Sequence, residues 1–454
     1  MTNSGRLGTY LPLLVLLALA FVVYAGSFGH DFLPNWDDYP YVLENETIRG
    51  FTLQHLRDAF SSYFVGNYAP VHIISYMVDY ALWELNPAGY VAGNILLHAL
   101  SGLLFFRLLV RVGQTPAMAF VAAAIFLVHP VQVESVAWIS QRKNVLAMFF
   151  FLVAFHEYLS CREGRAARGS HYFASLAALA AALLSKSVAV IFPAVVFLYD
   201  LSFPGEEKRR PGLVDKVPYL VVAAVVAGLA FLSQDEQVGG GRREYPGGSP
   251  LATFYTMLTV LPAYVRDCFV PTGLSPYYTV AVRQAPGAAV ILAFIFALLL
   301  AAVGVFLWRK ERSLFFFYML FSIGLLPVSQ IVPLIPLKND RYLYFPLLGF
   351  TGLMGGILSR LWLRYERRRL ALALLSVFVI TSLSILSWRQ ASIWRDDLTL
   401  WEHAVKLDPD NEVAWLLLMK GYTRRGNGAA AAAAHEHYLE LRDKNGPPRG
   451  WEKE

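Results

Sequence analysis

Long apolar runs separated by short polar segments dominate the hydrophobic pattern of this chain. A membrane-spanning α-helix needs about 20 predominantly apolar residues, within a range of about 17 to 25. Runs near that length recur as far as residue 388. We therefore predict an all-α polytopic membrane protein with about eleven transmembrane helices, over residues 10–29, 90–112, 116–134, 143–160, 171–186, 187–203, 215–233, 286–308, 313–333, 342–360 and 369–388.

One further apolar stretch, residues 250–270, departs from this pattern because Pro262, Arg266 and Asp267 interrupt it. Charged residues are costly in the hydrocarbon core of a membrane. We expect a helix there that lies at, or dips into, the membrane interface. The polar segments suggest a transmembrane domain over 1–388, with a first outer loop at 30–70, a second large outer segment at 234–285 and a polar tail at 389–454.

Composition and the placement of charge support a membrane protein with a defined orientation. Only 16% of the 454 residues are charged, whereas soluble proteins usually carry about 25%. Lys and Arg are denser in the short loops that share a side with the N-terminus, so the positive-inside rule places the N-terminus in the cytoplasm and the C-terminus outside. The net charge of +6 then reflects this topology, and we predict no nucleic-acid partner. Cys161 and Cys268 fall on opposite sides and are not expected to pair.

Ionisable residues gather in the segments predicted to face outward. Because such groups cost roughly 2.5 to 3.5 kcal/mol each at the centre of a bilayer, a cluster near the membrane needs an explanation. One explanation is structural, with salt bridges tying the outer loops together. The residues are Asp37, Asp38, His72, His129, Glu134, Arg142, Lys143, Lys186, Asp340 and Arg341.

The functional interpretation of this cluster is a transfer site with two halves. A carboxylate would take a proton from an incoming hydroxyl, and Arg or Lys would hold a phosphate that leaves as an anion. The chain has no Gly-rich phosphate loop and no dinucleotide fingerprint, which argues for a lipid-phosphate donor over a soluble nucleotide sugar. The pair Asp37 and Asp38 could hold a divalent cation only with further ligands, so the need for a metal stays open.

Two other classes of function compete with an enzyme. A transporter or flippase of lipid-linked sugars would place polar groups at mid-membrane on broken helices, whereas the charges here lie mainly in outer loops. A scaffold that recruits partners through the polar tail would need fewer spans than this chain has. The pattern therefore favours the enzyme.

Several sequence blocks resemble the TMTC-type membrane mannosyltransferases and their bacterial relatives. The block at residues 126–146, with His129-Pro130, Glu134 and Arg142, is the most specific. Asn144 and Ser187 stand where several relatives carry Asp and Glu, so we expect no catalytic role for either. The other blocks are Trp36-Asp37-Asp38, Asn86 to Tyr90 with Asn94 and His98, Leu184-Ser185-Lys186 followed by Pro193 and Tyr199-Asp200, and Leu326-Pro327 through Asp340 to Pro346.

This resemblance implies a C-type glycosyltransferase fold with its active site on the outer side of the membrane. It also implies a polyprenyl-phosphate sugar donor, commonly mannose, and inverting transfer to a Ser or Thr hydroxyl of a protein, with a glycan or lipid acceptor as the alternative. The general base would be Asp37 or Asp38. The donor phosphate would be bound by Arg341, Arg142 and Lys186. The candidates for sugar or acceptor contacts are His129, Glu134, Lys143, His72 and Asp340, although His129 and Glu134 have equally good structural interpretations.

The tail over 389–454 is polar and predicted to be helical. Trp401, Ala404 and Pro409 have the spacing of one tetratricopeptide helix, and Trp415 begins the pattern of the next, with residues 429–442 as its partner. That is about one and a half repeats, fewer than the three or so that a free-standing solenoid needs. We therefore expect the tail to pack on the outer surface or on a partner, as an acceptor-docking element or as a cap.

The amino-acid sequences of the blocks and the short tail resemble those of the bacterial relatives of the TMTC-type proteins. We therefore place the protein in a bacterial inner membrane with its site facing the periplasm. There the donor would be linked to undecaprenyl phosphate, and the acceptor would be an exported protein.

Overall fold

The computed structural model describes residues 3–163, 168–204, 212–233 and 244–445. Residues 234–243 of the predicted second outer segment and 446–454 of the predicted tail lie outside the described residues. Within the described ranges the chain is helical and forms no β-strand, which confirms the all-α prediction. The helices of the main bundle are α1 (Asn3–Val23), α4 (Pro87–Arg111), α5 (Pro116–Val128), α7 (Arg142–Arg162), α8 (Arg168–Leu183), α9 (Phe192–Ser202), α10 (Val217–Leu232), α11 (Pro250–Phe269), α12 (Ala288–Lys310), α13 (Arg312–Gly324), α14 (Pro346–Arg364) and α15 (Arg369–Ser392).

Each of the eleven apolar ranges overlaps a helix, but their count as membrane spans stays a prediction. In the described part of the chain, six helices are long and apolar enough to cross a membrane, or seven if one bent pair counts as a span. The bent pair is α5 with the segment Pro130–Ala137, at an angle of 50°. Pro130 accounts for the break, because a proline disfavours helical geometry in the residue before it. His129 is accordingly extended, with φ −75° and ψ 129°.

Glycines bring α13 and α14 into close contact. A Cβ atom added at Gly349 would lie 2.2 Å from the backbone nitrogen of Phe321, and one at Gly352 would lie 2.3 Å from the Phe317 ring. Small residues allow helix backbones to approach in this way inside a membrane. The close approach of α13 and α14 therefore depends on the glycines at their interface.

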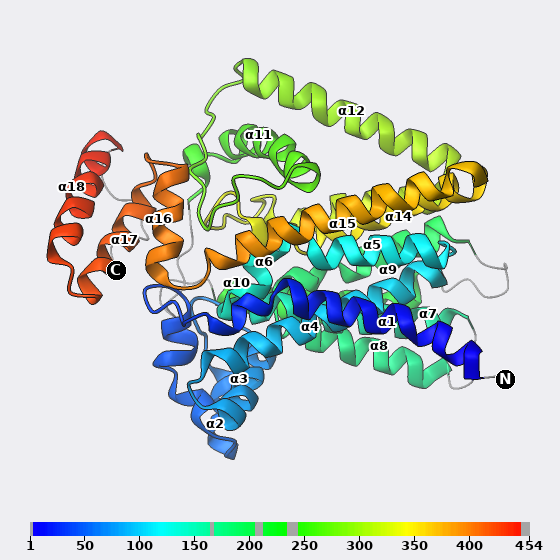
Figure 1. The fold of residues 1–454 in the computed structure, drawn as a ribbon, viewed down its shortest axis with the longest axis horizontal. Helices are drawn as coiled ribbons and strands as arrows, with labels where there is room; N and C mark the ends of the chain where they lie inside the picture. The colour runs from blue at the N-terminus through cyan, green and yellow to red at the C-terminus, as the bar shows by residue number, and fades with distance from the viewer. Residues whose placement is uncertain (1–2, 164–167, 205–211, 234–243, 446–454) are drawn as a thin grey trace.

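The remaining α-helices collect at one end of the bundle. They lie opposite the N-terminal end of α1 (Figure 1). Two of them, α2 and α3, fall in or beside the predicted first outer loop and were not anticipated as helices; the Thr52 hydroxyl caps α2 by accepting from the backbone N–H of His55. They are α2 (Leu53–Ser61), α3 (Pro70–Trp83), α6 (Val133–Ala137), α16 (Asp397–Leu407), α17 (Glu412–Arg424) and α18 (Gly428–Asn445).

The tail folds as three helices, of which α16 lies beside the bundle and α18 lies farthest from it (Figure 1). The Asn411 side chain caps α17 by accepting from the backbone N–H of Ala414 at 3.0 Å, and α18 covers the range 429–442 predicted as its partner. The tetratricopeptide assignment itself stays a prediction. α11 occupies the range expected to hold an interfacial helix, and its position relative to the membrane likewise stays a prediction.

Candidate functional site

Asp38 anchors the first outer loop to the helical bundle. Its side chain is fully buried and accepts hydrogen bonds from the backbone N–H of Leu33 at 2.8 Å and of Ser140 at 3.0 Å. The Ser140 hydroxyl also donates to it. Burial raises the pKa of Asp38 to about 6, although these hydrogen bonds favour the ionised form. All of its contacts therefore fix the loop in place.

Asp37 is the more accessible member of the carboxylate pair. Its side chain is 21% exposed and lies 3.4 Å from the ammonium group of Lys143. Lys143 is also 3.4 Å from the Tyr41 hydroxyl and lies over that ring, 4.7 Å from its centroid. Asp37 is thus a partly open carboxylate with a buried cation as its partner.

Three cationic side chains converge beside Asp37. The charges of Lys143 and Arg341 both act on Lys186, so these groups lie within electrostatic range of one another. Lys186 donates to the side-chain oxygen of Asn144 at 2.6 Å. The three come from distant parts of the sequence, the start of α7, the segment after α8 and the segment before α14. Such a group of Lys and Arg is suited to hold a phosphate.

Glu134 holds Arg341 in place through two contacts. One carboxylate oxygen accepts the backbone N–H of Arg341 at 2.8 Å, and the other pairs with its guanidinium group. The carboxylate is 1% exposed. The structure therefore brings Glu134 into the site as the residue that orients Arg341.

Arg142 is held by buried partners of its own. Its guanidinium group pairs with Asp79 at 2.7 Å and donates to the carbonyl oxygen of Tyr90 at 2.7 Å. A Cβ atom at Gly93 would lie 2.4 Å from the same guanidinium, so a side chain there would displace it. These contacts favour a structural role for Arg142, whereas the neighbouring Lys143 lies in the cluster.

His72 lies buried behind this cluster. Its ring contacts the rings of Tyr41 and Tyr76, with centroids 5.0 Å and 4.5 Å away. Burial, and then the charge of Lys143, hold the pKa of His72 well below its usual value. It is therefore a neutral side chain at pH 7, which fits a shaping role better than phosphate binding.

His129 and Asp340 belong to a second polar group next to the first. The His129 ring contacts the carbonyl oxygen of Cys268 at 3.0 Å. Asp340 accepts from the Tyr278 hydroxyl at 2.6 Å, and burial raises its pKa. Lys338 pairs with Asp267 at 2.9 Å. Sequence reasoning did not include Lys338 or Tyr278 in the site, although Lys338 stands three residues before Arg341.

The structure offers no group of three or more His, Cys, Asp and Glu side chains placed to hold a metal ion, within the ranges that it describes.

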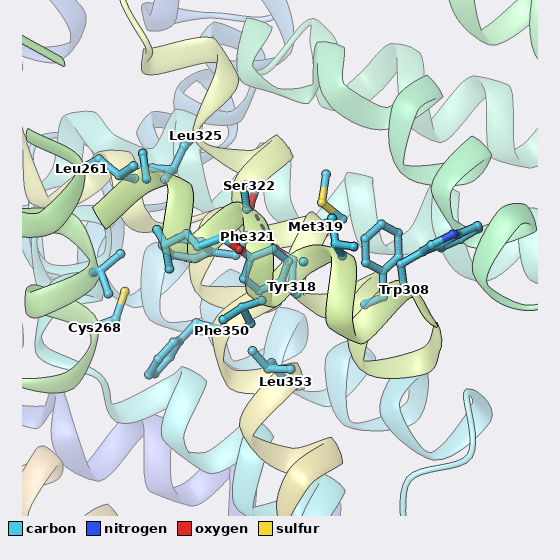
Figure 2. Close-up of a pocket in the computed structure, with 18 of the residues that line it drawn as sticks. Leu261, Cys268, Trp308, Tyr318, Met319, Phe321, Ser322, Leu325, Phe350 and Leu353 are labelled. Carbon is cyan, nitrogen blue, oxygen red and sulfur yellow. Dashed lines mark hydrogen bonds between the residues drawn. The ribbon is translucent and has the colours of Figure 1, made fainter. Parts of the chain in front are cut away.

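A large apolar cavity lies between α11, α12, α13 and α14. Its volume is about 720 Å³. Figure 2 shows side chains from these helices directed into it, with Cys268 and Leu261 at one end and Trp308 at the other. Cys268 is the residue whose carbonyl group contacts His129, so this end of the cavity adjoins the second polar group. The lining includes Leu261, Cys268, Ala301, Gly304, Trp308, Tyr318, Phe321 and Phe350.

Comparison with known proteins relates the chain to the protein O-mannosyl-transferases. No family model matches the sequence. A protein O-mannosyl-transferase of Caenorhabditis elegans is 24% identical over 431 residues, 90% of this chain and 59% of the relative. Mouse protein O-mannosyl-transferase TMTC3 is 22% identical over 84% of this chain and 46% of its own length. Mouse TMTC1 is 33% identical over a shorter stretch, 32% of this chain and 16% of its own.

These similarities confirm the resemblance to the TMTC-type proteins that the sequence blocks indicate. The chain spans about half the length of the relatives that it matches over most of its own. Two solved structures are also similar, both at low identity. ArnT from Cupriavidus metallidurans bound to undecaprenyl phosphate has 18% identity over 97% of this chain and 76% of its own, with a TM-score of 0.46. The oligosaccharyltransferase of Archaeoglobus fulgidus has 14% identity over 97% of this chain and 61% of its own, with a TM-score of 0.40.

Proposed function

We propose that this relative of the TMTC-type proteins is a membrane glycosyltransferase that moves mannose from a polyprenyl-phosphate donor to a Ser or Thr hydroxyl of an exported protein. The observation that carries the proposal is a partly open carboxylate, Asp37, set beside the cations Lys143, Lys186 and Arg341. A base and an anion-binding group are the two parts that transfer from a sugar phosphate requires. The names of the relatives supply mannose and a protein acceptor.

The base and the cations act on different parts of the reaction. Asp37 takes the proton of the acceptor hydroxyl as the oxygen forms its bond to the anomeric carbon. The bond between that carbon and the phosphate oxygen breaks on the opposite side, and the electron pair leaves with the phosphate. Lys186 and Arg341 stabilise the departing anion, because preorganised charges act strongly where water is largely excluded. The configuration at the anomeric carbon is inverted.

The contacts support Asp37 over Asp38 as the base. Both oxygens of Asp38 already accept buried hydrogen bonds from Leu33 and Ser140, which leaves little room for a substrate hydroxyl. The Asp37 carboxylate lies 3.4 Å from the Lys143 ammonium group, a long distance for an ion pair, and is 21% exposed. A donor phosphate that attracts Lys143 would release Asp37 toward the acceptor.

The apolar cavity suits the hydrocarbon chain of a lipid donor. Its side chains are almost all apolar, and its outer end adjoins Cys268. Asp267 precedes that residue and pairs with Lys338, near Arg341 in the sequence. A prenyl chain in the cavity would place its phosphate toward the cationic cluster. The proposal also includes a C-type glycosyltransferase fold and a location in a bacterial inner membrane. The site then faces the periplasm and the N-terminus lies in the cytoplasm.

The donor class is tested with purified protein in liposomes. Radiolabelled mannose is supplied either on polyprenyl phosphate or on a soluble nucleotide, with membrane-extract proteins as acceptors. We expect labelled protein from the lipid donor only. We also expect Lys186→Met to raise the KM for that donor at least tenfold, with Lys420→Met on the exposed tail surface as the matched control. Labelling from the nucleotide alone, or movement of the lipid across the bilayer without transfer, would overturn the proposal.

A further inference from the structure

We propose that the C-terminal tail is a positioning element of the transfer site, in which Trp401 holds Trp36 and thereby orients Asp37. This inference rests on the proposed role of Asp37 as the base. It assigns to α16 a task in the reaction that is separate from docking an acceptor. The tail then completes the site from outside the bundle.

A line of tryptophans connects the tail to the bundle through the first outer loop. The ring of Trp36 stacks on Trp401 of the tail, with centroids 4.6 Å apart and an angle of 27° between the planes. On its other side Trp36 meets Trp138, 4.7 Å away, and Trp138 stacks on Trp394 at 5.5 Å. Trp138 and Trp401 are each 1% exposed. Trp36 is therefore held between a ring of the bundle and a ring of the tail.

Polar contacts fasten the same loop to the tail at two further points. The backbone N–H of Asp31 donates to the carbonyl oxygen of Arg395 at 2.8 Å. The side-chain amide of Asn35 donates to the carbonyl oxygen of Leu417 at 3.0 Å. The tail thus holds the loop on the N-terminal side of Asp37, while Asp38 holds it to the bundle on the other side. Asp37 lies between these two anchors.

The tail also contacts the segment that supports the phosphate side of the site. His403 of α16 contacts the carbonyl oxygen of Leu274 at 3.1 Å, and Asn411 donates to that of Tyr277 at 3.1 Å. The next residue, Tyr278, donates to Asp340, the neighbour of Arg341. One tail therefore touches both outer segments on which the base and the leaving-group cations depend.

Placement of this kind matters for rate because transfer requires the base to meet the acceptor hydroxyl in a narrow range of geometry. A misplacement of about 1 Å is enough to cost roughly 100-fold in turnover. The loss falls on kcat, because Trp401 stacks on the loop that carries the base, whereas the donor is bound by the cations and the cavity. A docking role for the tail would instead change the KM for the acceptor.

The test compares Trp401→Ala, Trp401→Phe and the control Trp415→Ala in the full chain. Trp415 is also in the tail, but its ring packs on His437 and its N–H donates to Pro409. We expect Trp401→Ala to lower kcat about 10- to 100-fold with the donor KM within about twofold, Trp401→Phe to recover most of the rate, and Trp415→Ala to stay within about twofold of the intact protein. Unchanged kcat in Trp401→Ala, or a change confined to the acceptor KM, would overturn the inference.

A second measurement follows Asp37 without relying on activity. Asp37→Cys is introduced after Cys161 and Cys268 are replaced by serine, and its rate of labelling by a membrane-impermeant maleimide is recorded. We expect both Trp401→Ala and Trp36→Ala to accelerate labelling at least fivefold, and the double variant to add little beyond either. Equal labelling rates would overturn the positioning role. Full transfer activity in Asp37→Asn would instead refute the proposed function, whatever the labelling shows.

Discussion

The buried carboxylate Asp38 makes the stability of this protein depend on pH in a predictable direction. Its pKa is raised from the ordinary 3.8 to about 6 because burial outweighs the hydrogen bonds from Leu33 and Ser140. The folded state therefore binds the proton more tightly than the unfolded chain. The stabilisation from this group is complete below pH 4 and is lost as the pH rises through about 6.

The size of the effect follows from the two pKa values. The difference between about 6 and 3.8 corresponds to about 3 kcal/mol, since each tenfold change in proton affinity is worth about 1.36 kcal/mol. Asp38→Asn removes the titration. Its amide oxygen can still accept from Ser140, while its NH₂ group faces the N–H of Leu33 and loses that hydrogen bond. We expect the intact protein to be more stable than Asp38→Asn at pH 4 and to lose about 2.5 kcal/mol of that advantage by pH 8.

The assay is thermal unfolding of purified protein in detergent, recorded at intervals from pH 4 to pH 8. The quantity of interest is the difference in Tm between the intact chain and Asp38→Asn at each pH, because other titrating groups cancel in that difference. Asp410→Asn, an exposed change on the tail, is the matched control. A Tm difference that stays flat across this range, or that grows with pH, would refute the reasoning.

Three further predictions concern packing, a buried ion pair and the cavity. Gly349→Ala forces α13 and α14 apart and should lower Tm by several degrees, whereas Gly228→Ala, where a Cβ atom meets nothing within 4 Å, should leave it unchanged. Arg142→Ala leaves Asp79 buried without its cation, which should cost about 3 to 5 kcal/mol; adding Asp79→Ala should restore part of the yield of folded protein. Ala301→Trp narrows the cavity and should raise the KM for a long-chain donor more than for a short-chain one; equal effects on both would contradict the lipid assignment.

The hydrophobic pattern was sufficient to predict helices, because a membrane helix satisfies its own backbone hydrogen bonds and is coded by neighbouring residues. Each apolar range accordingly overlaps a helix. The number of spans is harder to predict because α5 breaks at Pro130 and several apolar helices, such as residues 187–202, are shorter than a span. Whether such a helix spans the membrane depends on its length and packing, which local sequence does not determine.

The sequence indicated candidate site residues but could not choose between adjacent ones. Asp38 turns inward because Ser140, 102 residues away, supplies its donors. Arg142 turns inward because Asp79 and Tyr90 lie behind it, which leaves Lys143 beside Asp37. These choices depend on contacts between distant segments, which carry no signal in a single sequence.

The sequence predicts that the tail packs on the outer surface or on a partner, but it does not indicate which residues make the contact. The sequence places Trp401 in a repeat pattern, whereas the structure stacks it on Trp36, 365 residues earlier. Two aromatic residues so far apart are paired only once the bundle has brought both ends of the chain together. The tail is thereby part of the region around the candidate site.

The most direct test of the account is the turnover of Asp37→Asn and Asp38→Asn, measured side by side with polyprenyl-phosphate mannose and a Ser/Thr-rich acceptor. Turnover is expressed per folded molecule, so that the stability effect of Asp38 is removed. We predict that Asp37→Asn lowers kcat by about 100-fold or more, the range expected for loss of a general base, while Asp38→Asn stays within about tenfold of the intact protein. Full turnover in Asp37→Asn, with loss of transfer only in Asp38→Asn, would contradict the account.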